Sequence, residues 1–128
     1  MKIKTLQAIN ARVGVMELLK KPMNYETARH LFKWRMFLKT ELQNAELFEK
    51  TLIEKYGGKR KTKKEIEFPD EESTRAFNAE MDNMLNTEIE TELKGIDVSK
   101  IDESGTLMLK GEIWELLEPI LLKAEETA

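Results

Sequence analysis

Residues 25–56, YETARHLFKWRMFLKTELQNAELFEKTLIEKY, form a long periodic segment with neither proline nor glycine. Their apolar residues recur at spacings of three and four or sums of these, which places them on one stripe of an α-helix. Asn24 is a preferred N-cap residue, and Glu26 complements the positive end of the helix dipole. Gly57 and Gly58 accept the left-handed conformation that commonly ends a helix. The segment therefore predicts one long helix, with a stripe of Leu31, Leu38, Leu42, Ala45, Leu52 and Tyr56 that Trp34, Phe37 and Phe48 widen.

The length of this helix is itself informative. At 1.5 Å per residue it extends about 48 Å, which exceeds the diameter of a compact domain of 128 residues. We therefore expect part of the helix to be kinked or to be covered by another chain.

A shorter helix is predicted before it. Thr5 is a suitable N-cap, and Pro22 ends the helix because the residue before a proline avoids the helical region. Gly14 weakens this helix by about 1 kcal/mol relative to alanine. The face expected to be buried follows the helical spacing and consists of Leu6, Ile9, Val13 and Met16.

Two further helices are predicted, at residues 70–87 and 110–122, and Pro119 is expected to kink the second of these. Short alternating segments near residues 65–68, 88–93 and 107–109 predict one small antiparallel β element. The fold class is mainly α: a long helix packed with an N-terminal helix and two shorter helices in a single domain, residues 1–128. The predicted core consists of Ile9, Val13, Leu31, Leu38, Leu42, Leu52, Phe77, Met81, Leu85, Trp114 and Leu117.

The charge is divided unevenly along the chain. Residues 1–64 contain 16 Lys or Arg and 6 Asp or Glu, whereas residues 65–128 contain 5 and 18, so the basic half carries +10 and the acidic half −13. Three interpretations are open. The halves neutralise each other within one chain, they join separate copies, or the basic half binds nucleic acid while the acidic half limits non-specific binding.

The basic residues that would contact nucleic acid or a partner fall into two groups. The first lies on the long helix, where Trp34 and Phe37 interleave with the cations, as in proteins that combine phosphate contacts with base stacking. The second is a basic run just after the helix, which is equally typical of a solvated connection. The predicted contact residues are Arg29, Lys33, Arg35, Lys39, Lys59, Arg60, Lys61, Lys63 and Lys64.

Residues that carry chemistry are few. There is no cysteine, which excludes thiolate nucleophiles and thiolate metal sites. The one histidine, His30, has no neighbouring signature of a general base or a metal ligand and is expected to be half-buried or at the surface. Glu112, Glu115 and Glu118 form an acidic row that would bind a divalent cation only opposite a second acidic row, such as one with Glu80 and Asp82. We expect no catalytic residues, no cofactor and no metal, and hence no enzyme.

The longest apolar runs are short, and none approaches the 18 or more residues typical of a membrane span. The N-terminus has no hydrophobic signal core. The sequence therefore predicts a soluble cytoplasmic protein that does not use a membrane.

Three segments resemble small proteins of tailed bacteriophages and prophages. They are ARHLFKWRMFLKTELQNAELFEKTLIEKYG at residues 28–57, FPDEESTRAFNAEMDNMLNTEIE at residues 68–90, and EIWELLEPILL at residues 112–122. The resemblance covers residues 25–122 and leaves residues 1–24 outside. It implies a phage-derived assembly or accessory factor, virion-associated in some cases, that acts through protein contacts, and it implies no catalytic residues.

The expected function is therefore that of a structural or interaction protein that self-associates or binds a protein partner through its long helix. The alternative is a nucleic-acid-associated regulator, similar to an antitoxin or a repressor accessory protein, that uses the basic half.

Overall fold

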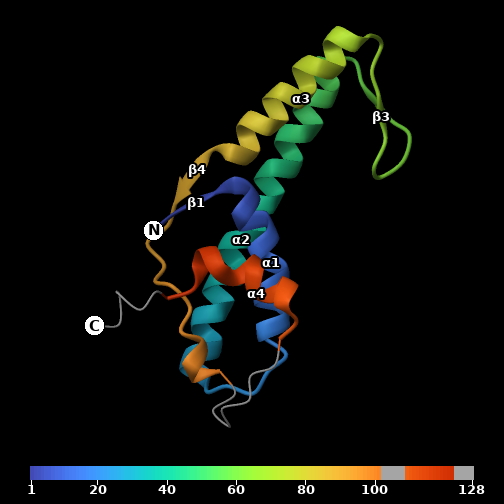
Figure 1. Ribbon diagram of the computed structural model, residues 1–128. Helices are drawn as coiled ribbons and strands as arrows, with labels where there is room; N and C mark the ends of the chain where they lie inside the picture. Colours follow the sequence, from blue (N-terminus) through green and yellow to red (C-terminus); the bar gives the residue numbers. More distant parts are fainter. Residues whose placement is uncertain (102–108, 123–128) are drawn as a thin grey trace.

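The chain folds mainly into α-helices, as the sequence predicts (Figure 1). The computed structural model describes residues 1–101 and 109–122. The α-helices in this part are α1 (Thr5–Leu18), α2 (Tyr25–Lys55), α3 (Glu71–Asn86) and α4 (Gly111–Leu117). The remaining elements are β1 (Lys2–Lys4), β2 (Lys59–Arg60), β3 (Ile66–Glu67), β4 (Glu88–Glu90) and the 3-10 turns η1 (Val98–Lys100) and η2 (Glu118–Ile120).

The ends of the helices follow from local chemistry. The side chain of Asn24 accepts a hydrogen bond from the backbone N–H of Thr27 at 2.8 Å and starts α2. Gly57 follows the end of α2 with a φ of 68°, a conformation that costs little only for glycine. Asp70 caps α3 by accepting from the N–H of Ser73 at 2.7 Å. Pro119 lies in η2, where α4 gives way to a 3-10 turn. The boundaries at Asn24, Gly57 and Pro119 are as predicted, whereas the predicted N-cap Thr5 is already the first residue of α1 and Lys4 takes the cap position.

The long helix α2 passes through two environments (Figure 1). Its N-terminal half lies in the body of the molecule beside α1 and α4. Its C-terminal half pairs with α3 in an arm that ends in the loop carrying β2 and β3, and Leu52 and Phe77 are buried there. The expected kink is absent, because α2 is one continuous helix and α3 packs along this half of it.

Helix α1 buries a different face from the one predicted. Its buried residues are mostly small: Thr5, Ala8, Ala11, Gly14, Val15 and Leu18. Val13 is 49% exposed, and Ile9 is only half-buried, so both were wrongly assigned to the core. The physical reason is close packing, since α1 contacts both α2 and α4, and only short side chains let two neighbouring helices approach it together.

The rest of the core is partly as predicted. Five expected residues are buried, namely Leu31, Leu38, Leu52, Phe77 and Leu117, while Leu42, Met81, Leu85 and Trp114 are only half-buried. The core also includes Trp34, which is fully buried, and four isoleucines outside the α-helices: Ile3, Ile96, Ile101 and Ile120. Ile120 follows Leu117 at helical spacing in the helix predicted at residues 110–122, whereas Ile3, Ile96 and Ile101 have no helical spacing around them, so periodicity did not identify these three.

Within residues 1–101 and 109–122, the strands form two small antiparallel sheets rather than the single β element predicted. Strand β1 pairs with β4, and Ile3 lies opposite Ile89. Strand β2 pairs with β3 across a turn at residues 61–65. The predicted strand signals near 65–68 and 88–93 are therefore confirmed, but each segment pairs with a basic segment earlier in the chain. Of the third predicted segment, residues 107 and 108 lie outside the described residues.

Candidate functional site

The predicted cations of the long helix lie on its solvent side. Arg29, Lys33, Arg35 and Lys39 are all exposed, and none forms an ion pair with any residue at 1–101 or 109–122. With 3.6 residues per turn, Arg29 and Lys33 lie to one side of Phe32 and Met36, and Arg35 and Lys39 lie mainly to the other. We call this surface the α2 outer face; it consists of Tyr25, Arg29, Phe32, Lys33, Arg35, Met36 and Lys39.

The apolar part of the α2 outer face is unusually open to solvent. Tyr25 is 74% exposed, Met36 66% and Phe32 42%. The guanidinium carbon of Arg35 lies 5.3 Å from the centre of the Phe32 ring, within the range of a cation–π contact. This contact holds one cation of the face beside its apolar stripe.

Of the two interpretations of Trp34 and Phe37, base stacking or part of the apolar stripe of the helix, the structure supports the second. Trp34 is fully buried, and its indole N–H donates to the backbone oxygen of Lys94 at 2.9 Å. Phe37 is half-buried and packs edge-on against Trp34. Phe32 and Tyr25 are exposed instead. Their seven-residue spacing along the helix was the available signal.

The basic run at residues 59–64 lies elsewhere, in the loop at the tip of the arm (Figure 1). Roughly 24 Å of helix separates Lys39 from Lys55, before the run begins. Arg60 pairs with Glu49, and Lys61 pairs with Glu67 at 3.1 Å, so acids compensate two cations of the run. The structure therefore does not bring the two predicted groups, at 29–39 and at 59–64, into one surface.

A second exposed surface lies on α1 and was not predicted. Leu6 is 44% exposed, Val13 49% and Met16 40%, and Ile9 lies between them at helical spacing. We call these four residues the α1 outer face. A helix with apolar residues around most of its circumference is normally buried on all sides, which makes this uncovered face a candidate for contact with another molecule.

His30 has a structural role in this fold. Its Nε2 lies 2.9 Å from the backbone oxygen of Lys94, the same atom that accepts from Trp34. A carbonyl oxygen only accepts hydrogen bonds, so Nε2 is the protonated nitrogen. His30 is half-buried, as expected, and together with Trp34 it holds the segment that leads into buried Ile96.

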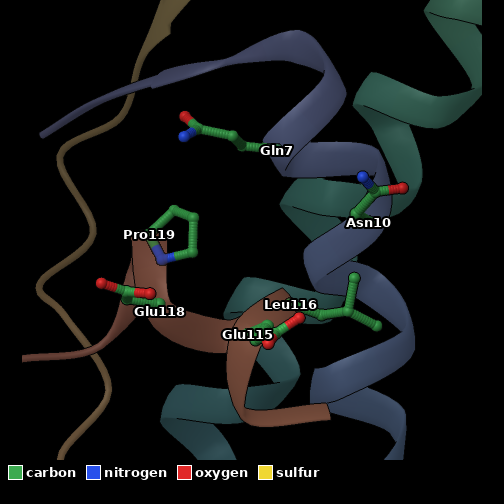
Figure 2. Close-up of a pocket in the computed structure, with 6 residues that line it drawn as sticks. All are labelled: Gln7, Asn10, Glu115, Leu116, Glu118 and Pro119. Atoms are coloured by element: carbon green, nitrogen blue, oxygen red, sulfur yellow. The ribbon is translucent and has the colours of Figure 1, made fainter. Parts of the chain in front are cut away.

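A hollow of about 460 Å³ lies between α1 and the segment formed by α4 and η2. Figure 2 shows Gln7 and Asn10 on the side of α1, and Glu115, Leu116, Glu118 and Pro119 on the other side. Glu115 of α4 and Glu118 of η2 thus lie opposite amides, whereas Glu80 lies on the arm and bonds to Tyr56. Of the lining groups, the amide oxygen of Gln7 already accepts from the backbone N–H of Lys4 at 2.9 Å. This hollow offers carboxylates and amides but neither a nucleophile with an adjacent base nor a set of ligands around one point. Across the described residues, no group of three or more potential metal ligands comes together.

The only electrostatic coupling that links the two helices of the arm involves Glu80, within the described residues. The hydroxyl of Tyr56 donates to Glu80 Oε2 at 2.6 Å, and Lys55 Nζ lies 3.4 Å from Oε1. The hydrogen bond from Tyr56, with a smaller contribution from Lys55, lowers the pKa of Glu80 below its ordinary value. This contact joins the basic and acidic halves within one chain.

No protein-family model, curated protein or solved structure matches this chain. The described helices include none that is both long enough and apolar enough to cross a membrane. The α1 outer face and the α2 outer face are the features of the described residues that bear most directly on function.

Proposed function

We propose that this protein is a non-enzymatic interaction protein, which associates with itself through the α1 outer face and binds a partner through its long helix. The observation that carries the proposal is the pair of apolar stripes on α1. One stripe is buried by α2 and α4, and the opposite stripe, Leu6, Ile9, Val13 and Met16, remains open to solvent. Burial of that stripe against another protein would be favourable by about 25 cal/mol per Å².

A second copy of the chain is the occupant that fits the α1 outer face best. Its four residues carry no charge, and Lys20 at its C-terminal end is paired with Glu17 at 3.0 Å, so the centre of a twofold arrangement of α1 against α1 brings no like charges together. The four side chains provide less than the ~800 Å² per partner of a standard interface. We therefore expect a dimer of micromolar affinity whose mass depends on concentration.

The test is the molar mass in solution, measured by size exclusion with light scattering over a range of concentrations at low and high salt. We expect a dimer that persists at high salt, because apolar contacts are not screened by ions. Val13→Glu should raise the dissociation constant at least about tenfold by placing a charge in the interface. Asn44→Glu, which adds the same charge at an exposed polar position of α2, is the matched control.

Three outcomes decide the matter. A monomer at every concentration, or an unchanged mass for Val13→Glu, would contradict self-association through α1. An oligomer that dissociates at high salt would instead indicate that the oppositely charged halves join separate copies.

We also propose that the protein originates from a tailed phage or prophage. The order of a long helix, an acidic helix and a final helix followed by EPILL supports an assembly or accessory protein of a tailed phage or prophage, working in the host cytoplasm or in the virion. Neighbouring genes that encode virion proteins would agree with this origin. A genomic surrounding without phage genes would contradict it.

The nucleic-acid-associated regulator remains the second candidate. It is favoured by the four exposed cations at 29–39, a segment that contains no acid, and by the exposed ring of Phe32 beside them. Binding to DNA or RNA would weaken steeply as salt rises. The absence of binding to any oligonucleotide at low salt would remove this candidate.

A further inference from the structure

We propose that the α2 outer face binds an acidic amphipathic helix of another protein. This inference deepens the proposed function by naming the class of partner for the long helix, and it rests on that function being protein contact. Three features support this partner: the spacing of the apolar residues on the face, the positive charge along both of its edges, and the lack of a free apolar stripe on α3 and α4.

The apolar residues of the face have the spacing of a helix–helix seam. Tyr25, Phe32 and Met36 follow one another at intervals of seven and four residues, which keeps them within roughly 40° of one another around the helix. In a heptad register Tyr25 and Phe32 take d positions and Met36 an a position, while Arg29 and Lys39 take the other seam positions, so the face is a short apolar seam with cations within it and beside it. A partner helix can therefore pack along this stripe for about three turns.

The charged residues flank the apolar stripe, where charge determines which partner helix can bind. Arg29 and Lys33 lie along one edge of the stripe, and Arg35 and Lys39 lie along the other. Flanking charges of this kind set partner choice in helix pairs through attraction to opposite charges and repulsion of like ones. Because both edges are positive and residues 29–39 contain no acid, the matching helix carries carboxylates on both of its edges.

The same charges exclude the α2 outer face of a second copy. Two such faces would bring cations against cations in both the parallel and the antiparallel orientation. The α1 outer face, in contrast, is neutral and has no such restriction. The two faces are thus suited to different occupants.

The acidic helices of this chain do not fit the face either. On α4 the exposed residues Glu112, Glu115 and Glu118 form an acidic row, but buried Leu117 and half-buried Ile113 face the core. On α3 the apolar residue Phe77 is buried in the arm. Neither helix has a free apolar stripe to place against Phe32 and Met36, so the partner is a different protein.

A helix fits this face better than a nucleic acid or a lipid surface does. The exposed rings of Tyr25 and Phe32 are suitable for stacking bases, but the apolar stripe separates the two rows of cations instead of leaving one continuous basic groove for a single backbone. A flat membrane would meet the whole length of α2, including exposed Glu46 and Glu54 further along it. A partner helix needs to contact only the cationic segment.

The experiment is a fluorescence-anisotropy titration of the full-length protein. The probe is a labelled synthetic helix of about three heptads, with leucine at the two apolar positions and glutamate at the flanking positions. A peptide with lysine in place of glutamate is the control for charge. A single-stranded oligothymidine and vesicles of phosphatidylcholine with phosphatidylserine are titrated in parallel.

Two variants and a matched control locate the binding site. Phe32→Ala combined with Met36→Ala removes the stripe, and Lys33→Glu combined with Arg35→Glu reverses one cation on each edge. Lys59→Glu combined with Lys64→Glu makes the same charge change at exposed residues of the basic run. All six positions are exposed, so the fold should be retained, and circular dichroism checks this.

We expect saturable binding of the acidic peptide, at least about tenfold weaker for both α2 variants and within about twofold of wild type for the control. The lysine peptide should not bind. Failure of the acidic peptide to bind at low salt, or equal loss in the control variant, would overturn the proposal. So would tighter binding of the oligothymidine or the vesicles than of the acidic peptide.

The failure of this inference is distinguishable from failure of self-association. The peptide titration reports on the α2 outer face, whereas the mass measurement reports on the α1 outer face. Val13→Glu should therefore leave peptide binding unchanged, and Phe32→Ala with Met36→Ala should leave the molar mass unchanged.

Discussion

Gly14 is a residue whose local cost is offset by packing. Glycine within a helix is less favourable than alanine by about 1 kcal/mol, and the sequence offers no reason for it. In the fold, a Cβ at this position would lie 2.5 Å from Cγ and 2.7 Å from Cδ2 of Leu117. Leu117 is fully buried, so its side chain has little room to move away. Gly14 therefore allows α4 to pack directly against α1.

Gly14→Ala should accordingly destabilise the protein. Overpacking of a filled core costs about 1–3 kcal/mol, which outweighs the gain of about 1 kcal/mol in helix propensity. We expect the free energy of unfolding, measured by urea denaturation, to fall by about 1 kcal/mol. In a Leu117→Ala background the clash is absent, so the same substitution should become stabilising. The same sign of effect in both backgrounds would contradict this contact.

At the scale of elements, the sequence predicted the helix boundaries, because these depend on residues that are close together in the chain. The caps Asn24, Gly57 and Asp70 act within one turn, and the structure confirms the helix boundaries they set. Which face of a helix is buried depends on distant partners. α1 has two apolar stripes, and periodicity selected the one with larger residues, whereas contact with α2 and α4 buries the one containing Ala8 and Ala11.

The candidate site was predictable to a similar extent. Position on α2 and charge identified Arg29, Lys33, Arg35 and Lys39 as exposed. The sequence did not identify Phe32 as the exposed aromatic residue beside them. Trp34 is buried instead, where its indole N–H donates to the backbone oxygen of Lys94, 60 residues later. No local pattern predicts such a contact, and Phe32 remained exposed as a result.

The arm formed by α2 and α3 should respond to acid through Glu80. Its folded-state pKa is lowered by the hydrogen bond from Tyr56 and, to a smaller extent, by Lys55. A carboxyl with a lowered pKa stabilises the fold above its unfolded-state pKa, and that stabilisation is lost as pH falls through the folded-state pKa. Tyr56→Phe removes the main cause, so the pKa of Glu80 should rise towards its ordinary value.

The measurement is an NMR titration of the Glu80 carboxyl carbon in the wild type and in Tyr56→Phe. Asp70 provides an internal control, because its pKa is lowered by the backbone N–H of Ser73 and should not change in the variant. Identical Glu80 titration curves in the two proteins would show that the contact with Tyr56 does not form in solution.

For the whole molecule, the basic and acidic halves meet along the chain's own fold at several places. Lys55 contacts Glu80, and Lys61 contacts Glu67. Strand β1 places Lys2 opposite Glu90 and Lys4 opposite Glu88, with Ile3 buried beneath them. Part of the opposed charge is thus matched internally, while the cations of the α2 outer face are left available.

Reversal of charge in the small β1–β4 sheet tests whether this matching occurs within one chain. Glu88→Lys with Glu90→Lys places like charges opposite each other, which should cost a few tenths to about 1 kcal/mol per pair, less at high salt. Adding Lys2→Glu and Lys4→Glu to the same chain should restore the urea midpoint, because each pair again has opposite charges. An equimolar mixture of two proteins, one with Glu88→Lys and Glu90→Lys and the other with Lys2→Glu and Lys4→Glu, distinguishes pairing of the strands within one chain from pairing between copies. If β1 pairs with β4 of its own chain, the mixture should unfold like its destabilised components; recovery of the wild-type midpoint would mean that the strands pair between copies.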